Sequence, residues 1–163
     1  MTSFNAYALR ETAIGMAINL AIGTAFFFGL FGGQAEPQVW GGKGLIIDCV
    51  PQGFMIGLMS IIPAMLITSK RAKAGLRFDH LPSGKGVLPR NVFGRGLTVA
   101  LLSMVTLVAV AAGLALATGV QSLPFWLAYG LKCLPAVVIS ALVIPPALVV
   151  ALRTATAAQP ASA

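Results

Sequence analysis

The chain has 163 residues, of which 58% are hydrophobic and only 9% are charged. A soluble domain carries about a quarter charged residues, so this composition excludes an ordinary soluble globular fold. The 11 basic and 4 acidic residues give a net charge of +7, which can indicate nucleic-acid binding. Most of the basic residues, however, lie in the segment 70–95 between long uncharged stretches, as in a loop between membrane spans. We therefore expect an integral membrane protein that contacts the lipid bilayer and binds no nucleic acid.

Charged residues are absent from the stretches 12–35, 49–69, 96–131 and 133–152. A helix that crosses a bilayer needs roughly 20 apolar residues. The third stretch is too long for one span, and a polar turn that contains Gly119 and Pro124 divides it. Uninterrupted apolar runs lack the alternation of barrel strands. The sequence predicts an all-α membrane protein, a four-transmembrane-helix bundle with spans of about 12–32, 48–69, 97–118 and 126–152.

The first expected span carries small residues at every fourth position, on one face: Ala13, Ala17, Ala21, Ala25 and Gly29. Small residues let another helix approach closely, and we expect this face to meet Gly53 and Gly57 of the second span. Asn19 would be costly in lipid, so it is a candidate for a polar contact with another helix. A functional polar site at Asn19 is the alternative. Serines within the spans, Ser60 and Ser140 among them, can hydrogen-bond to their own helices.

Prolines recur in the second and fourth spans. Pro51 is expected in the first turn of its helix, where the missing N–H is harmless. Pro63, Pro135 and the Pro145-Pro146 pair fall inside spans, where each removes a backbone hydrogen bond. They predict fixed bends, or hinges as the alternative.

The basic segment sets the orientation. Basic residues favour the cytoplasmic side, so the loop 70–96 and both termini are expected inside, with Lys43 and Lys132 on the outer side. A belt of aromatic residues supports this, because Trp40, Phe125, Trp126 and Tyr129 all fall at the outer boundary. The tail 154–163 is expected to be disordered. The residues expected to attract anionic lipid headgroups are Lys70, Arg71, Lys73 and Arg77.

The two halves of the chain share an ordered pattern. Trp40, Gly44-Leu45 and Cys49-Val-Pro51 recur as Trp126, Gly130-Leu131 and Cys133-Leu-Pro135. A Pro-Ala pair followed by a basic residue recurs as well, at 63–70 and 146–153. The pattern predicts tandem duplicated helical hairpins, related by a pseudo-twofold axis along the membrane normal.

Duplication makes Asp48 and Lys132 equivalent positions of opposite charge, so they form a candidate charge pair. The alternative is that Asp48 caps its helix and Lys132 extends toward the interface. Cys49 and Cys133 are also equivalent and form a candidate cysteine pair, with burial as free thiols as the alternative.

The pattern of Trp, Gly-Leu, two prolines and a basic residue resembles uncharacterised bacterial inner-membrane proteins built from one or two transmembrane hairpins. The resemblance covers the second helix of each half and implies the location but no activity. One histidine and four scattered acidic residues predict no catalytic constellation, cofactor or metal site, so we expect no enzyme. The sequence favours a structural or accessory subunit with a membrane-protein partner. The alternative is a small transporter or channel that acts as a homodimer.

Overall fold

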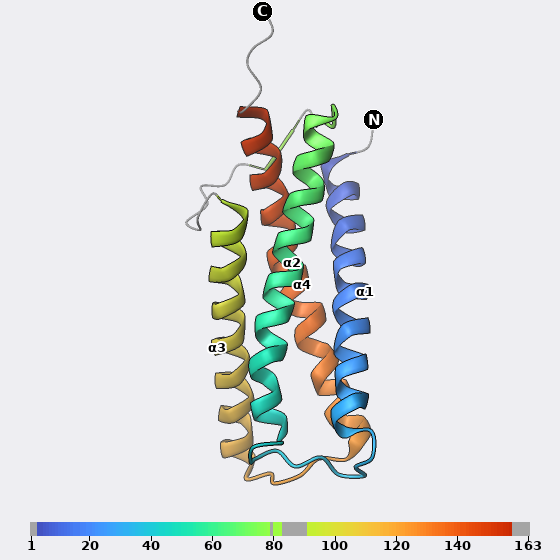
Figure 1. The fold of residues 1–163 in the computed structure, drawn as a ribbon, viewed down its shortest axis with the longest axis vertical. Coiled ribbons are helices and arrows are strands. Elements are labelled where there is room, and N and C mark those ends of the chain that lie inside the picture. The colour runs from blue at the N-terminus through green and yellow to red at the C-terminus, as the bar shows by residue number, and fades with distance from the viewer. Residues whose placement is uncertain (1–2, 79, 83–90, 158–163) are drawn as a thin grey trace, which may run out of the picture.

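A computed structural model of the chain describes residues 3–78, 80–82 and 91–157. Within this part the chain folds into long helices, shown in Figure 1: α1 (Phe4–Phe31), α2 (Leu45–Lys73), α3 (Val92–Thr118) and α4 (Phe125–Ala157). All 4 are long and apolar enough to cross a membrane. For the described residues, the prediction of an all-helical fold with four helices able to span a membrane is therefore confirmed.

Polar residues and glycine mark the helix ends. The Ser3 hydroxyl accepts a hydrogen bond of 3.3 Å from the Ala6 N–H, which caps α1. The Asn91 side chain accepts from the Gly94 N–H and caps α3 in the same way. Gly119, with φ at +66°, ends α3 in a left-handed conformation that suits glycine.

The helices run past the predicted spans because a helix can continue beyond the hydrocarbon layer with its charged side chains in water. The expected loop 70–96 is shorter than predicted, because α2 continues to Lys73 and α3 begins at Val92. Positions 79 and 83–90 of this loop lie outside the described residues. The prediction of disorder from residue 154 is wrong for 154–157, which continue α4. There the Thr154 hydroxyl donates to the Val150 carbonyl at 2.8 Å and the Thr156 hydroxyl to the Leu152 carbonyl at 2.9 Å. Residues 158–163 lie outside the described part.

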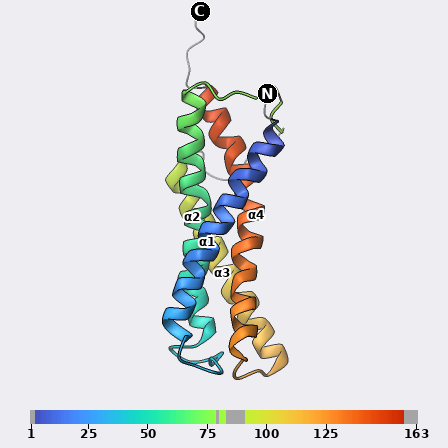
Figure 2. The ribbon, with the colours of Figure 1, turned by 90° about the vertical axis from the view of Figure 1, so that its right-hand side faces the viewer.

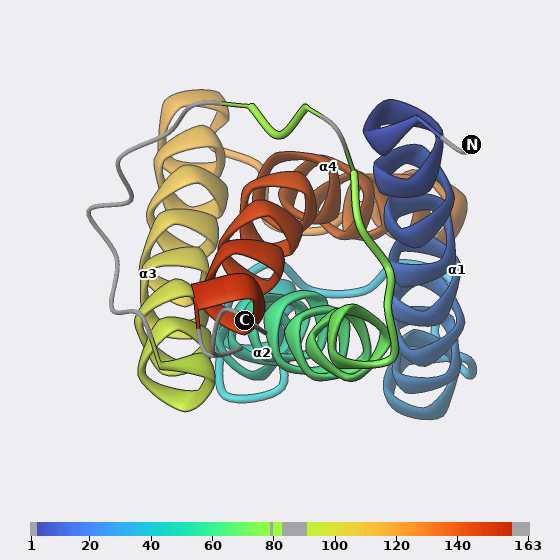
Figure 3. The same ribbon diagram turned by 90° about the horizontal axis from the view of Figure 1, so that it is seen from above.

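Helices α2 and α4 form the centre of the bundle, and α1 and α3 flank them on opposite sides, as Figure 3 shows from above. Each flanking helix packs mainly on one of the two central helices: α3 packs on α2, and α1 packs on α4. Both ends of the described chain lie at the same end of the bundle (Figure 2). An apolar cluster fills that end around Phe4, Leu148 and Leu152. Another, built on Phe27 and Phe31, fills the opposite end.

The two connections at the end away from the termini pair with each other. The Val39 N–H donates to the Gln121 carbonyl at 2.8 Å, and the Leu123 N–H donates to the Pro37 carbonyl at 3.1 Å. The Trp40 indole N–H also donates to the Val120 carbonyl, at 3.2 Å. These bonds join the α1–α2 connection to the α3–α4 connection.

The first part of α2 differs from the prediction for Pro51. The helix begins at Leu45, after the N-cap Gly44, so Pro51 lies inside it rather than in its first turn. The early start is possible because the Leu45 and Ile46 N–H groups donate to the carbonyls of Gln38 and Val39, at 2.9 and 3.2 Å.

The prediction that the small-residue faces of α1 and α2 meet is wrong. Gly53 and Gly57 lie against α3 instead, where an added Cβ would come within 2.7 Å of the Met104 Cα and 2.6 Å of the Ala100 Cα, respectively. The small-residue face of α1 is exposed along its whole length: Ala13, Ala17, Ala21, Ala25 and Gly29. Close backbone approach therefore joins α2 to α3 and leaves the α1 face uncovered.

A methyl group at Gly57 should separate α2 from α3, because its nearest neighbours are backbone atoms that cannot move aside. We expect Gly57→Ala to lower the free energy of unfolding in mild detergent by about 1–3 kcal/mol. Gly29→Ala is the matched control, since nothing lies within 4 Å of a Cβ built there, and it should be neutral or stabilising. Equal effects of the two substitutions would contradict the packing of α2 on α3.

Candidate functional site

Most of the buried polar side chains of the bundle line the seam where α1, α2 and α4 meet. They form three groups: an ion pair at the end away from the termini, a hydrogen-bonded cluster near the middle, and a second ion pair near the termini. Such groups are costly in lipid unless they pair with one another. The seam is therefore the candidate functional site.

The first group joins α2 to α4. The Lys132 ammonium donates to the Asp48 carboxylate, and both residues are 8% exposed. Asp48 lies in the first turn of α2, where the helix dipole favours a negative charge. The rings of Phe27 and Phe31 lie 5.7 and 5.9 Å from the ammonium and face it as cation–π partners. The Gln52 amide adds a hydrogen bond of 2.8 Å to the Lys132 carbonyl, so α2 holds α4 here through both charge and backbone.

The second group joins three helices. The Asn19 Nδ2 atom donates to the Ser60 and Ser140 hydroxyls, both at 2.9 Å, and the two hydroxyls lie 3.2 Å apart. Both serines are completely buried, and Asn19 is 4% exposed. The expectation that these serines serve only their own helices does not hold. One asparagine instead ties α1 to both central helices.

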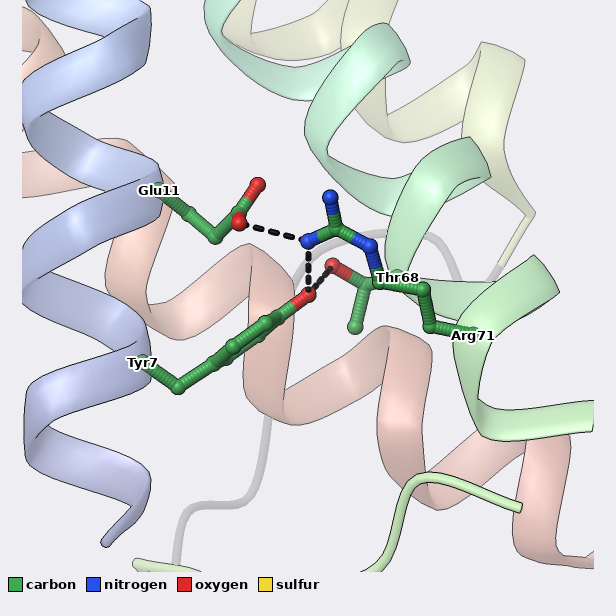
Figure 4. Close-up of polar contacts among 4 residues, drawn as sticks. All are labelled: Tyr7, Glu11, Thr68 and Arg71. Carbon is green, nitrogen blue, oxygen red and sulfur yellow. Dashed lines mark hydrogen bonds and ion pairs between the residues drawn. The ribbon is translucent and has the colours of Figure 1, made fainter. Parts of the chain in front are cut away.

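The third group, shown in Figure 4, joins α1 to α2 near the termini. The Arg71 guanidinium donates to the Glu11 carboxylate at 2.5 Å and to the Tyr7 hydroxyl at 3.2 Å. The Tyr7 hydroxyl also shares a hydrogen bond of 2.9 Å with the Thr68 hydroxyl. The sequence did not single out Tyr7, Glu11 or Thr68, because Tyr7 and Glu11 precede the predicted first span. Their spacing of four on a longer α1 was the available signal.

The remaining predicted residues are not brought together. Cys49 and Cys133 are free thiols, so the candidate cysteine pair is wrong and the free-thiol alternative describes them. Lys70 and Lys73 at the end of α2, and Arg77 just beyond it, are exposed, and their contact with lipid headgroups stays a prediction. Arg71 differs, because its guanidinium is engaged with Glu11 while 43% of its side-chain surface stays exposed.

Two hollows adjoin the seam. A groove of about 670 Å³ lies among α2, α3 and α4, and aliphatic side chains such as Val110, Leu114 and Leu131 line most of it. A smaller cavity of about 50 Å³ lies beside the first and second polar groups. No cluster of three His, Cys, Asp or Glu residues that could hold a metal ion occurs within the described residues.

The Asp48–Lys132 pair should be strongly coupled, because removal of either partner leaves a buried charge alone. We expect Asp48→Leu and Lys132→Met each to lower the free energy of unfolding by about 3–5 kcal/mol, and the double variant to lose less than either single variant. Chemical unfolding in detergent measures all three. Lys43→Met, a change at an exposed lysine of the α1–α2 connection, is the control and should have little effect. Additive losses would show that the two charges act independently.

Comparisons of the chain with known protein families, with curated proteins and with solved structures find no match. The geometry of the seam and of the lipid-facing surfaces is therefore the basis for assigning a role.

Proposed function

We propose that the chain is a non-enzymatic protein of the bacterial inner membrane that acts as a structural or accessory subunit. The four apolar helices support an integral membrane location. The observation that carries the role is the contrast between the two faces of α1. Its polar side chains Glu11 and Asn19 face the seam and bond within the chain, whereas its small-residue face stays open. A face of this kind suits contact with another membrane helix.

The open face fits a helix of a partner membrane protein. Lipid offers no hydrophobic drive for helix association, so close approach over small side chains supplies the contact energy. The face runs from Ala13 to Gly29, nearly the length of a span, with no larger side chain at these positions. A partner helix can therefore follow α1 through the membrane.

The transporter alternative has weaker support. The cavity lined by Asn19, Asp48 and Lys132 is only about 50 Å³, whereas ligand pockets measure about 300–1,000 Å³. The larger groove is almost entirely aliphatic and offers a polar solute few partners. A packed seam of paired polar groups fits an assembly role better than passage of a substrate.

The proposed orientation places both termini and the basic loop in the cytoplasm. The two ends of the described chain, the start of α1 and the end of α4, share one end of the bundle (Figure 1), which is also the end of the exposed Arg10, Lys70 and Lys73. This asymmetry of basic residues is typical of the cytoplasmic side. The same exposed cations suit anionic lipid headgroups, which lie at that surface.

A tandem duplication with a pseudo-twofold axis accounts for the helix arrangement. Exchange of the two halves relates α1 on α4 to α3 on α2, which are the main contacts of the flanking helices. It also relates the connections that pair at Gln38 and Ser122. The duplicated positions Asp48 and Lys132 would then meet beside the axis, with opposite charges that stabilise the contact.

Labelling of single cysteines tests the orientation. In a background with Cys49 and Cys133 replaced by alanine, a membrane-impermeant thiol reagent should label Gly42→Cys from outside intact spheroplasts. It should label Ala74→Cys only after permeabilisation, because Ala74 follows α2 at the opposite end of the bundle. Labelling of Ala74→Cys in intact cells would overturn the proposed orientation.

Substitution on the open face tests the accessory role. We expect wild-type protein, purified in mild detergent, to retain a stoichiometric membrane-protein partner, and Ala21→Leu to lose it because the larger side chain blocks close approach. Ala109→Leu is the matched control, since it makes the same change on an exposed face of α3. Quantitative mass spectrometry of the purified samples measures the ratio. Loss of the partner in both variants, or a wild-type chain without any partner, would contradict the proposal.

A further inference from the structure

The small cavity beside the seam has a polar wall. It lies between α1 and α2, with Lys132 of α4 on one side, and has a volume of about 50 Å³. Four polar residues line it: Asn19, Asp48, Gln52 and Lys132. The rest of its wall is apolar, with Met55 and Met59 among the lining residues. Each of the four polar residues already makes a hydrogen bond or ion pair to the protein. Some of their polar atoms, however, have no partner among the described residues.

Among these four residues, Asn19 is the clearest example of a side chain with an unpartnered polar atom. Its Nδ2 atom uses both hydrogens on Ser60 and Ser140, and its carbonyl oxygen accepts no hydrogen bond from the described residues. Asn19 is only 4% exposed and lines the cavity, so a molecule held there can donate a hydrogen bond to this oxygen. A carbonyl with little access to solvent and no donor is energetically costly. Gln52 and Lys132 likewise direct one polar group each to the protein and keep further hydrogen-bonding capacity.

We propose that this cavity is a binding site for water, held between the Asn19 carbonyl and the Asp48–Lys132 pair. The volume accommodates a few water molecules, and each needs two to four polar partners, which the four lining residues supply. The charges of Asp48 and Lys132 cancel, so the site has no net charge to select an ion. A lipid chain would leave the carbonyl without a donor, whereas water donates to it.

An apolar side chain closes the site on the side of the termini. On the side of the termini, the completely buried Ile144 side chain occupies the space beside Gly15, where a Cβ would collide with it. Gly15 lies between Glu11 and Asn19 on α1, so the Ile144 side chain separates the water site from the Arg71–Glu11 group. The water stabilises the seam locally and does not form a path across the membrane.

Radiolytic footprinting tests the site in the full chain, reconstituted in lipid nanodiscs. Hydroxyl radicals formed from bound water add to the thioether sulfur of nearby methionine, and dissolved oxygen then takes up the remaining hydrogen atom to leave the sulfoxide. Met55 lines the cavity, whereas Met65 lies on the same helix, is 1% exposed and does not line it. In the wild type we expect Met55 to be oxidised at least about fivefold faster than Met65.

Two variants separate bound water from general exposure. Asn19→Leu removes the carbonyl and should bring the oxidation rate of Met55 down to that of Met65; Gln52→Leu should act in the same direction and serves if Asn19→Leu does not fold. Ile22→Leu, which changes the cavity wall without a polar group, is the control and should keep the wild-type ratio. Equal rates of Met55 and Met65 in the wild type would show a dry cavity and overturn the proposal. A Met55 rate unchanged in the folded leucine variants would also overturn it.

Discussion

The bilayer offers no hydrogen-bond partners, so a polar group within the spans is costly unless it finds a partner inside the protein. This constraint explains why the polar side chains of α1, α2 and α4 converge on one seam. Asp48 needs Lys132, and Asn19 needs Ser60 and Ser140, because each would otherwise face lipid. The polar contacts hold α1 on the central pair, where its packing with α2 is sparse, whereas α3 is held by close backbone approach at Gly53 and Gly57.

These two modes of attachment differ in what they require of the sequence. Close approach needs glycine and tolerates no added atom, so α3 has one fixed position on α2. Polar contacts instead act at separate points along α1, from Tyr7 through Asn19 to Thr24, and leave room between them. The cavity beside Asn19 lies in such a space. Hydrogen bonds at intervals and a water-sized hollow are therefore two results of the same arrangement.

The sequence predicted the helices but not which of their small-residue faces pack together. Long uncharged stretches specify four spans, because length and hydrophobicity are local properties of the chain. Partner choice depends on which faces meet in three dimensions, and small residues at steps of four on α1 and α2 looked alike although only Gly53 and Gly57 are buried. The group of Tyr7, Glu11 and Arg71 was missed for a related reason. Charge was used to mark the ends of the spans, so a charged residue that bonds beyond an end could not be assigned.

The ion pair of Asp48 and Lys132 shows where sequence reasoning does reach a contact. When two opposite charges occupy matching positions of a repeated pattern, pairing lowers the cost of placing each of them in lipid. The structure places the two charges together. The same pattern gave no such result for Cys49 and Cys133, because neighbouring residues on a helix point about 100° apart. When the charged neighbours turn toward each other, the cysteines turn away and remain free. A helix can thus bring only one of two adjacent positions to a shared contact, and here the position with the greater cost in lipid is the one that is paired.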